Sequence, residues 1–357
     1  MLIGLAIIAT FLLSCGKTSK EAAEPTDDDA SDDDSGPTQL KIDSVVPSRG
    51  GASVSTEVTI HGDGFKEGLV VTVGNTPVES VKVISSTEAK AVFPSIPLTD
   101  RGLKDVVVTL GDQRAVLPNG FEYFFDEDPI VFVHGYFVTA NEWDVMIERF
   151  KELGYPEDYL AAIQFSDNIG SNIPNAKDKL PPFVDAVLEK TGAEKVDIVA
   201  HSMGGLSTRL WIKLYGGADK VRDYVTIAGT HHGSSMACLI GWLGEGADEM
   251  CPVYATQEES QNDVQWELNG DPDSDDVDET PFGVEDGGGI YWNSVWTDAD
   301  QMVVPPTSSC LNQKSRNDCS DPLNIMVHGV EHLHMQLDEG VSEIVKTLVL
   351  KHNVSKP

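Results

Sequence analysis

Two kinds of hydrophobic pattern divide the chain, and the first extends from residue 41 to residue 125. Apolar and polar residues alternate there in short runs, which are separated by Gly, Pro, Asn and Asp. Short alternating runs with turn residues between them predict strands joined by turns, so this segment is expected to form a small β-sandwich. The expected strands are 58–60, 69–73, 81–84, 89–93 and 106–110.

The second pattern begins at Pro129, where continuous apolar runs alternate with longer helical stripes. Continuous runs predict strands buried on both faces, whereas apolar residues that recur every three or four positions predict amphipathic helices. The alternation of the two predicts a mostly parallel, doubly wound α/β sheet. The expected strands are 130–133, 159–165, 195–200, 224–228, 291–296 and 323–328, and the expected helices are 141–153, 180–188 and 206–214.

Ser202 stands at the sharpest break in this second pattern. It follows a β-branched strand and precedes a helical stripe, and the small residues Ala200 and Gly204 lie two positions away on either side. This spacing is that of a nucleophile elbow, in which small neighbours permit a strained turn that exposes the hydroxyl above the sheet edge. The backbone N–H of Met203 then points to where an oxyanion would form. An ordinary strand–helix turn can carry the same spacing by chance, so the motif needs partners.

The charge balance limits the classes of partner. Acidic residues outnumber basic ones by 58 to 25, and no Lys or Arg occurs between Arg222 and Lys314. This excess argues against nucleic acid as a partner, because binding it requires clustered Lys and Arg. The Asp-rich run at 271–278 lacks the Gly and the distal Glu of an EF-hand loop, so we predict no metal site there. No organic cofactor is predicted either.

The N-terminus predicts export. Residues 2–13 form an apolar run that is too short to span a bilayer comfortably and fits the core of a secretory signal. The run ends in Leu-Leu-Ser-Cys15, which resembles the lipobox of bacterial lipoproteins. That resemblance implies a signal peptide over residues 1–15, with Cys15 as the lipid-modified N-terminus of an envelope or surface lipoprotein. A simple secretion signal with an incidental Cys is the alternative. Residues 16–40, rich in Asp, Ser, Pro and Gly, predict a disordered acidic tether.

Residues 41–126 also carry specific motifs. The segments 42–51, 58–65 and 121–123, which read IDSVVPSRGG, VTIHGDGF and FEY, resemble the IPT/TIG immunoglobulin-like module. The resemblance implies an all-β immunoglobulin-like sandwich of the kind that serves as a spacer or adhesive unit in bacterial surface proteins. Because the segment contains no catalytic constellation, we favour a passive spacer.

A Ser nucleophile needs a base and a third group that orients the base. In a sheet with a nucleophile elbow these groups follow in the order Ser, then Asp or Glu, then His, each on a loop after a strand. The loop after strand 291–296 contains Asp298 and Asp300, and the loop after the last expected strand contains His332. The chain therefore offers Ser202, an Asp and His332 in the required order.

The chain from about Pro129 to the C-terminus resembles the small secreted Bacillus-type triacylglycerol lipases. The resemblance rests on residues 129–134, 196–205, 294–300 and 327–332. It implies an α/β-hydrolase domain over residues 127–357 in which Ser202 is the nucleophile, Asp300 the acid and His332 the base. Tyr136 matches the position whose N–H joins that of Met203 in the oxyanion hole.

Several competing residues flank these positions. Asp298 lies close enough in sequence to orient the base, but Asp300 matches the family position. We expect His328 to pack or cap at the end of its strand, and His334 has neighbours that do not match the motif. His134 is expected to orient the oxyanion loop. His201, His231 and His232 are expected to make structural hydrogen bonds.

Four cysteines besides Cys15 favour disulfides in an exported chain. Three pairings are open, and proximity favours Cys238 with Cys251 and Cys310 with Cys319. An insertion at about 236–288 begins with an apolar cluster and continues with acidic residues. It is expected to form either a lid or acyl-binding cap over Ser202 or a cap packed shut against the sheet.

These patterns predict an exported, lipid-anchored serine hydrolase that cleaves carboxylic esters, with an acylglycerol as the expected substrate and a triacylglycerol lipase as the expected enzyme. A short-chain esterase, thioesterase or acyltransferase is the alternative within enzymes. A surface adhesion protein with a non-catalytic hydrolase scaffold is the alternative outside them, and the intact Ser, Asp and His argue against it. The sequence leaves the oligomeric state open.

Overall fold

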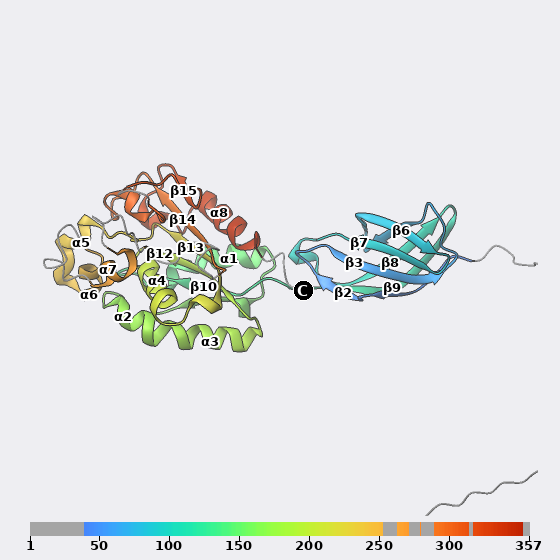
Figure 1. The fold of residues 1–357 in the computed structure, drawn as a ribbon, viewed down its shortest axis with the longest axis horizontal. Helices are drawn as coiled ribbons and strands as arrows, with labels where there is room; N and C mark the ends of the chain where they lie inside the picture. Colours follow the sequence, from blue (N-terminus) through green and yellow to red (C-terminus); the bar gives the residue numbers. More distant parts are fainter. Residues whose placement is uncertain (1–38, 253–262, 271–278, 280–288, 314–316, 353–357) are drawn as a thin grey trace, which may run out of the picture. The chain divides into compact units, whose positions relative to one another are not determined.

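A computed structural model describes residues 39–252, 263–270, 279, 289–313 and 317–352 of the 357-residue chain (Figure 1). The predicted signal peptide with Cys15, almost all of the predicted tether and the acidic run 271–278 lie outside the described residues. In the part that is described, no helix is long and apolar enough to cross a membrane.

The first domain consists of two sheets and one short helix, η1(Leu98–Asp100). One sheet is antiparallel and has the order β1(Lys41–Val46), β3(Thr56–Asp63), β7(Glu88–Phe93) and β6(Ser80–Ser85). The other has the order β2(Arg49–Gly51), β9(Gln113–Phe124), β8(Gly102–Leu110), β4(Val70–Val73) and β5(Thr76–Pro77). Alternate residues of β3 are buried, and the rings of Phe93, Phe121 and Tyr123 meet edge to face in the core. The sequence predicted β3, β4, β6, β7 and β8 but missed β1, the short β2 and β5, and the long β9.

The second domain contains a six-stranded sheet in which all adjacent strands are parallel. Its order is β11(Leu160–Ile163), β10(Ile130–Val133), β12(Val196–His201), β13(Val221–Ile227), β14(Tyr291–Thr297) and β15(Asn324–Val327). Every residue of β10 and β12 is buried. This burial explains why apolar residues there are largely consecutive and do not alternate with polar ones. The parallel sheet and the all-β domain together confirm the predicted fold class.

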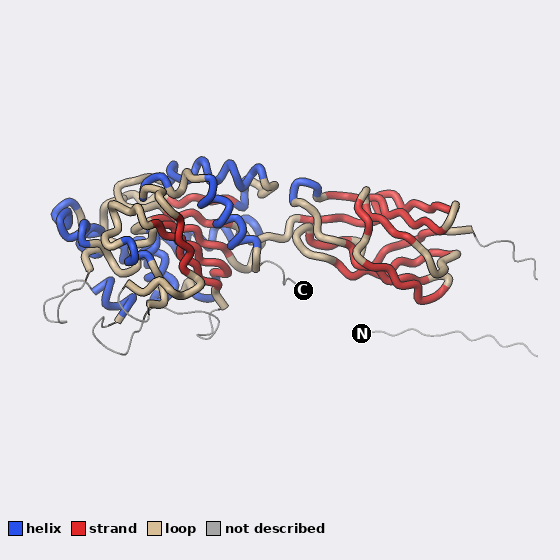
Figure 2. The backbone as a smooth tube through the Cα atoms, turned by 90° about the horizontal axis from the view of Figure 1, so that it is seen from above, coloured by secondary structure: helices blue, strands red, loops and turns tan. Residues whose placement is uncertain are grey.

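Helices cover both faces of this sheet (Figures 1 and 2). Helices α1(Asp144–Glu152) and α8(Glu339–Leu350) share one apolar core with the sheet, whereas α3(Leu180–Thr191) and α4(Gly204–Leu214) share the core of the opposite face. Two of these helices have well-suited end residues. Gly192 adopts φ +72° and ends α3, and Asp338 accepts a hydrogen bond from the N–H of Val341 and begins α8.

The direction in which successive strands are added to the sheet reverses after β11. After β10 the chain goes outward to β11 and then returns to place β12 on the other side of β10. In doubly wound sheets, ligands bind in the crevice at the carboxyl ends of the strands where such a reversal occurs. The residues after β10 and β12, which include Tyr136 and Ser202, lie at this edge.

The described parts of the predicted insertion are helical. They comprise α5(Ser235–Ile240), η6(Gly241–Leu243), α6(Glu245–Glu249) and α7(Asp263–Asn269). A disulfide joins Cys238 to Cys251, and a second one joins Cys310 to Cys319. These are the two pairings that proximity favours, so the second pairing restrains the segment between Asp300 and His332.

Candidate active site

Ser202 lies in a strained turn between β12 and α4. Its φ is +52°, in the left-handed region that a residue with a side chain rarely adopts. Its N–H donates to the carbonyl oxygen of Ile227 at 3.0 Å. A Cβ on Gly204 would lie 2.7 Å from the carbonyl oxygens of Val133 and His134, so glycine is required where the helix passes the end of β10. The turn has the geometry of a nucleophile elbow.

The structure brings Ser202, His332 and Asp300 into one hydrogen-bonded chain. The Nε2 atom of His332 lies 3.0 Å from Ser202 Oγ, and its Nδ1 atom lies 2.8 Å from Asp300 Oδ2. The three residues follow β12, β14 and β15, so they meet at the carboxyl edge of the sheet. The His332 side chain is 4% exposed and that of Asp300 is 1% exposed. A base with an orienting carboxylate therefore faces the hydroxyl of the elbow Ser.

Burial decides the protonation of the base. Desolvation lowers the pKa of His332 below the usual histidine value, although the hydrogen bond with Asp300 opposes the shift. The neighbouring His201 lowers the pKa of His332 further. A neutral imidazole, which is the form that can accept a proton, is thus favoured near pH 7.

Asp298, the other candidate acid, has a different partner. It lies 2.8 Å from Nδ1 of His328 and accepts a hydrogen bond from the N–H of Gly329. The hydrogen bond with His328 lowers the pKa of Asp298. Both side chains are open to solvent, at 48% and 72% exposure. The expectation that His328 packs was therefore wrong, because the loop after β15 carries it outward to Asp298. His334 is also exposed and lies beside Glu331.

Backbone donors converge on Ser202 from two segments. Tyr136 follows β10, and Met203 follows Ser202 itself. Among the hydrogen bonds of the described residues, neither of these two N–H groups donates to another part of the chain. Tyr136 also lines the cleft that contains Ser202 and His332. Tyr136 therefore shares the cleft with Ser202 and Met203 adjoins Ser202 in sequence, and the oxyanion hole that they would form stays a prediction.

His134 fixes the orientation of the first donor. Its Nε2 accepts a hydrogen bond from the N–H of Phe165 at 3.0 Å, so the proton of the neutral ring sits on Nδ1. Nδ1 then donates to the carbonyl oxygen of Gly135 at 2.9 Å. Burial lowers the pKa of His134, which keeps the ring neutral. The carbonyl of Gly135 and the N–H of Tyr136 belong to the same planar peptide unit, so this bond aims the N–H of Tyr136.

The remaining histidines make the structural contacts that the sequence led us to expect. His231 Nε2 lies 2.8 Å from Thr226 Oγ1, and burial lowers the pKa of His231 well below its usual value. His232 lies beside the carbonyl oxygen of Ser308. His201 lies 2.8 Å from a carboxylate oxygen of Glu142. The sequence did not single out Glu142, because a Glu in a predicted helix has no distinguishing pattern.

The cleft above Ser202 is largely apolar. Its lining includes side chains from the insertion and from the loops that carry Asp300 and His332, namely Met236, Ile240, Met250, Met302, Val303 and Leu333. Further apolar side chains of the insertion are exposed: Trp242 is 82% exposed and Leu239 is 68% exposed. Such a lining suits a hydrocarbon chain attached to a reacting carbonyl group.

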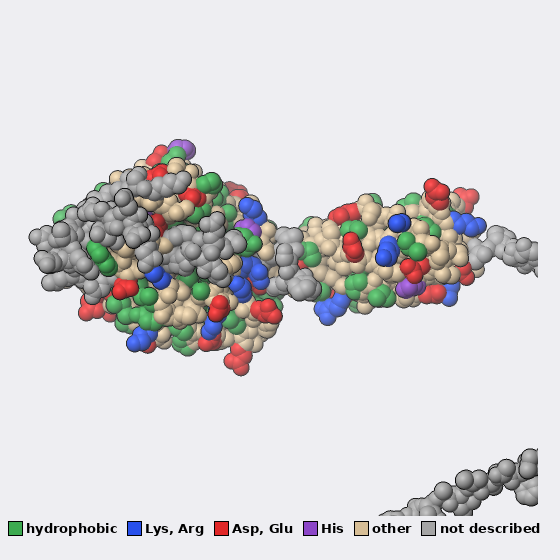
Figure 3. All heavy atoms as spheres, in the orientation of Figure 1, with side chains coloured by type: hydrophobic (Ala, Val, Ile, Leu, Met, Phe, Trp, Pro, Cys, Tyr) green, Lys and Arg blue, Asp and Glu red, His purple; other side chains and the backbone are tan. Residues whose placement is uncertain are grey.

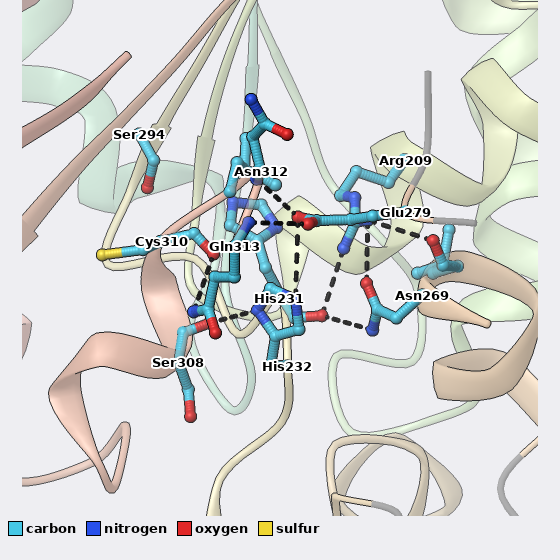
Figure 4. Close-up of polar contacts among 12 residues, drawn as sticks. Arg209, His231, His232, Asn269, Glu279, Ser294, Ser308, Cys310, Asn312 and Gln313 are labelled. Atoms are coloured by element: carbon cyan, nitrogen blue, oxygen red, sulfur yellow. Dashed lines mark hydrogen bonds and ion pairs between the residues drawn. The ribbon is translucent and has the colours of Figure 1, made fainter. Parts of the chain in front are cut away.

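A buried polar network holds the described end of the insertion in place (Figure 4). Arg209 of α4 donates to the carbonyl oxygen of His231 and to the side chain of Asn269 in α7. Glu279 accepts hydrogen bonds from the N–H groups of Asn312 and Gln313 at 2.9 and 3.0 Å. Burial lowers the pKa of Arg209, and the nearby Glu279 opposes that shift. Helix α7 is therefore packed against α4, whereas α5 and η6 keep exposed apolar side chains.

The described surface carries charges of both signs. In the orientation of Figure 3, Lys and Arg side chains are interspersed with Asp and Glu over the described surface. Among the described residues, no group of three or more His, Cys, Asp or Glu side chains is placed to hold a metal ion.

Comparison with known families matches both domains. Residues 127–257 match the family model of class 2 lipases, and residues 40–123 match that of the IPT/TIG domain. The resemblances to a lipase and to an IPT/TIG module are therefore confirmed over these residues.

Solved structures with a similar chain include a lipase of Bacillus licheniformis in its mature form. It is 17% identical, with 63% of this chain and 92% of that chain covered and a TM-score of 0.44. The carboxylesterase CesB of Bacillus subtilis is 15% identical, with 70% and 88% covered and a TM-score of 0.37. The protein SGBP-B from a xyloglucan utilization locus in Bacteroides uniformis is 24% identical, with 24% and 23% covered and a TM-score of 0.20.

Proposed function

We propose that this chain, in which a class 2 lipase domain follows an IPT/TIG domain, is a serine hydrolase that cleaves carboxylic esters. The observation that carries the proposal is the continuous hydrogen-bonded chain from Ser202 through His332 to Asp300. A base aligned with a Ser hydroxyl, beside two N–H groups without partners in the described chain, has the parts needed for acyl transfer.

The reaction would proceed in two halves. The Nε2 atom of His332 accepts the proton of Ser202 while Oγ attacks the ester carbonyl, and the N–H groups of Tyr136 and Met203 bind the oxyanion. His332 then gives the proton to the leaving alcohol, which departs and leaves an acyl group on Ser202. A water molecule, deprotonated by His332, attacks the acyl group. The bond to Ser202 Oγ then breaks, His332 returns its proton to Oγ, and the carboxylic acid leaves. Asp300 keeps the imidazole in the required tautomer throughout.

The apolar cleft supports an acylglycerol with medium or long acyl chains as the substrate, and hence a triacylglycerol lipase. Short-chain esters or thioesters are the second candidate. A chain-length series of soluble and emulsified esters separates the two. An optimum at acetyl esters would favour the esterase.

Replacing Ser202 with Ala tests the proposal directly. We expect ester hydrolysis to fall by several orders of magnitude while thermal unfolding stays close to wild type, and His332→Ala should behave in the same way. A folded Ser202→Ala protein that retains turnover would exclude the proposed nucleophile.

We also propose that the protein is exported and held at a membrane by a lipid on Cys15, which lies outside the described residues. The motif Leu-Leu-Ser-Cys15 at the end of an apolar run supports this. Replacing Cys15 with Ala should move the protein from the membrane fraction to the soluble fraction. Continued sedimentation with membranes would exclude a lipid anchor at this residue.

A further inference from the structure

One buried carboxylate contacts three segments of the site. Glu142 belongs to the short helix η2(Ala140–Trp143), which precedes α1. Its Oε1 accepts a hydrogen bond from the N–H of Gly135 at 2.9 Å, and its Oε2 lies 2.8 Å from Nδ1 of His201. The side-chain amide of Gln336, in the segment after His332, donates to Oε2 at 3.4 Å. The loop after β10, the nucleophile elbow at the end of β12 and the segment after His332 thus meet at one side chain.

We propose that Glu142 is a positioning residue for ester hydrolysis, which places the loop carrying Tyr136 through the N–H of Gly135 and sets the charge beside His332 through His201. This inference rests on the function proposed above and deepens it. Glu142 itself does not touch the reacting atoms.

The first part of the argument concerns the loop. Gly135 lies so close to the nucleophile that a Cβ on it would be 3.0 Å from Ser202 Cβ and 3.2 Å from His201 Nδ1. Glu142 holds the N–H of Gly135, and His134 holds its carbonyl. Both ends of this residue are therefore fixed, and the N–H of Tyr136, on the peptide unit that follows, is fixed with them. Loss of the Glu142 contact would remove one of the two hydrogen bonds that fix the position of this oxyanion donor.

The second part concerns charge. The side chains of His201 and Glu142 are 1% and 5% exposed, and the rings of His201 and His332 are 4.9 Å apart. Burial lowers the pKa of His201, but the carboxylate of Glu142, together with the more distant Asp300, more than offsets this, so the net pKa is raised. A protonated His201 lowers the pKa of His332 by more than Glu142 raises it. His134 is a further titratable group near His201, which lowers the pKa of His134.

Two variants test the proposal, Glu142→Gln and His201→Gln. His201→Gln removes the imidazole beside His332, and Glu142→Gln removes the carboxylate that keeps that imidazole protonated. We expect the acid limb of kcat/KM to move to higher pH, because His332 then holds its proton more tightly. The Gln side chain in Glu142→Gln also turns one donor towards either Gly135 or His201. We therefore expect kcat to fall about 10- to 100-fold with KM within about threefold, less than the loss of a whole oxyanion donor.

The assay must separate positioning from folding. A fluorophosphonate ester that reacts with Ser202 counts the competent sites, and all rates are expressed per titrated site. The matched controls are exposed groups: Glu148→Gln replaces a carboxylate of α1 that pairs with Lys151, and His328→Gln replaces the histidine that pairs with Asp298. Both controls should keep the wild-type kcat and acid limb.

The outcomes are distinct. A wild-type protein that neither reacts with the probe nor hydrolyses esters would contradict the proposed function. An active wild type together with Glu142→Gln and His201→Gln variants that keep kcat within twofold and an unmoved acid limb would overturn only the role of Glu142. If Glu142→Gln fails to fold, the acid limb of His201→Gln decides alone.

Discussion

Replacing Asp300 with Asn separates the two carboxylates that follow β14 and tests which of them orients the base. Asp300 Oδ1 accepts hydrogen bonds from the N–H groups of Met302 and Val303 at 2.8 and 2.7 Å, while Oδ2 faces Nδ1 of His332. An Asn side chain must keep its oxygen towards the two N–H donors, because an amide nitrogen cannot accept them. Its NH₂ group is then forced towards His332.

The size of the effect follows from this geometry. An NH₂ group that points at Nδ1 makes Nδ1 an acceptor and moves the proton of the neutral ring to Nε2. With a proton on Nε2, His332 cannot accept the proton of Ser202. Locking a catalytic histidine in the wrong tautomer costs about 10⁴-fold in kcat, which corresponds to about 5.4 kcal/mol of transition-state stabilisation. Because the two backbone bonds remain, the fold should stay intact.

The measurement is kcat on a soluble ester, expressed per site titrated with a fluorophosphonate. Asp298→Asn is the matched control, since Asp298 makes the same kind of contact with an exposed histidine at the same distance of 2.8 Å. We expect the control to lie within twofold of wild type. If Asp300→Asn keeps more than a tenth of the activity, or if Asp298→Asn loses as much, Asp300 is not the orienting acid.

Three further predictions concern pH, the cleft and the disulfide. Because burial lowers the pKa of His332, the acid limb of kcat/KM should lie below pH 6.5. Activity should be lost as the pH falls through the pKa of His332 in the folded protein, because the base becomes protonated. An acid limb above pH 7 would contradict this. Trp242 is 82% exposed, and replacing it or Leu243 with Ala should lower the turnover of emulsified long-chain esters by roughly tenfold. The turnover of acetyl esters should stay within twofold of wild type. Equal losses on both substrates would indicate a purely structural role. Replacing both Cys310 and Cys319 by Ser should lower the free energy of unfolding by roughly 2.5–3 kcal/mol, because the disulfide closes a loop of about ten residues. Denaturant titrations measure this change, and an unchanged midpoint would refute a stabilising disulfide.

The sequence by itself determined the fold class and the elbow. Both rest on local patterns: a strand buried on both faces is largely apolar, as β10 is throughout and β12 is apart from Asp197 and His201, and a strained turn requires small neighbours such as Gly204. Burial and backbone sterics impose these patterns over a few residues, so they can be read without knowing what lies across the fold. The long strand β9 escaped because Pro118 and Gly120 interrupt its apolar pattern.

Only the tertiary structure decided which side chains meet. Asp298 and Asp300 are two residues apart on one loop, yet one turns outward to His328 and the other inward to His332. The lipase resemblance favoured Asp300, and the side-chain contacts in the structure distinguish the two. Glu142 looks like any other Glu of a helix until the parallel sheet brings Gly135 and His201 to it. Such contacts depend on strand order, because it sets which loops share the carboxyl edge of the sheet. Residues as far apart as Ser202 and His332 therefore carry no local sign that they touch.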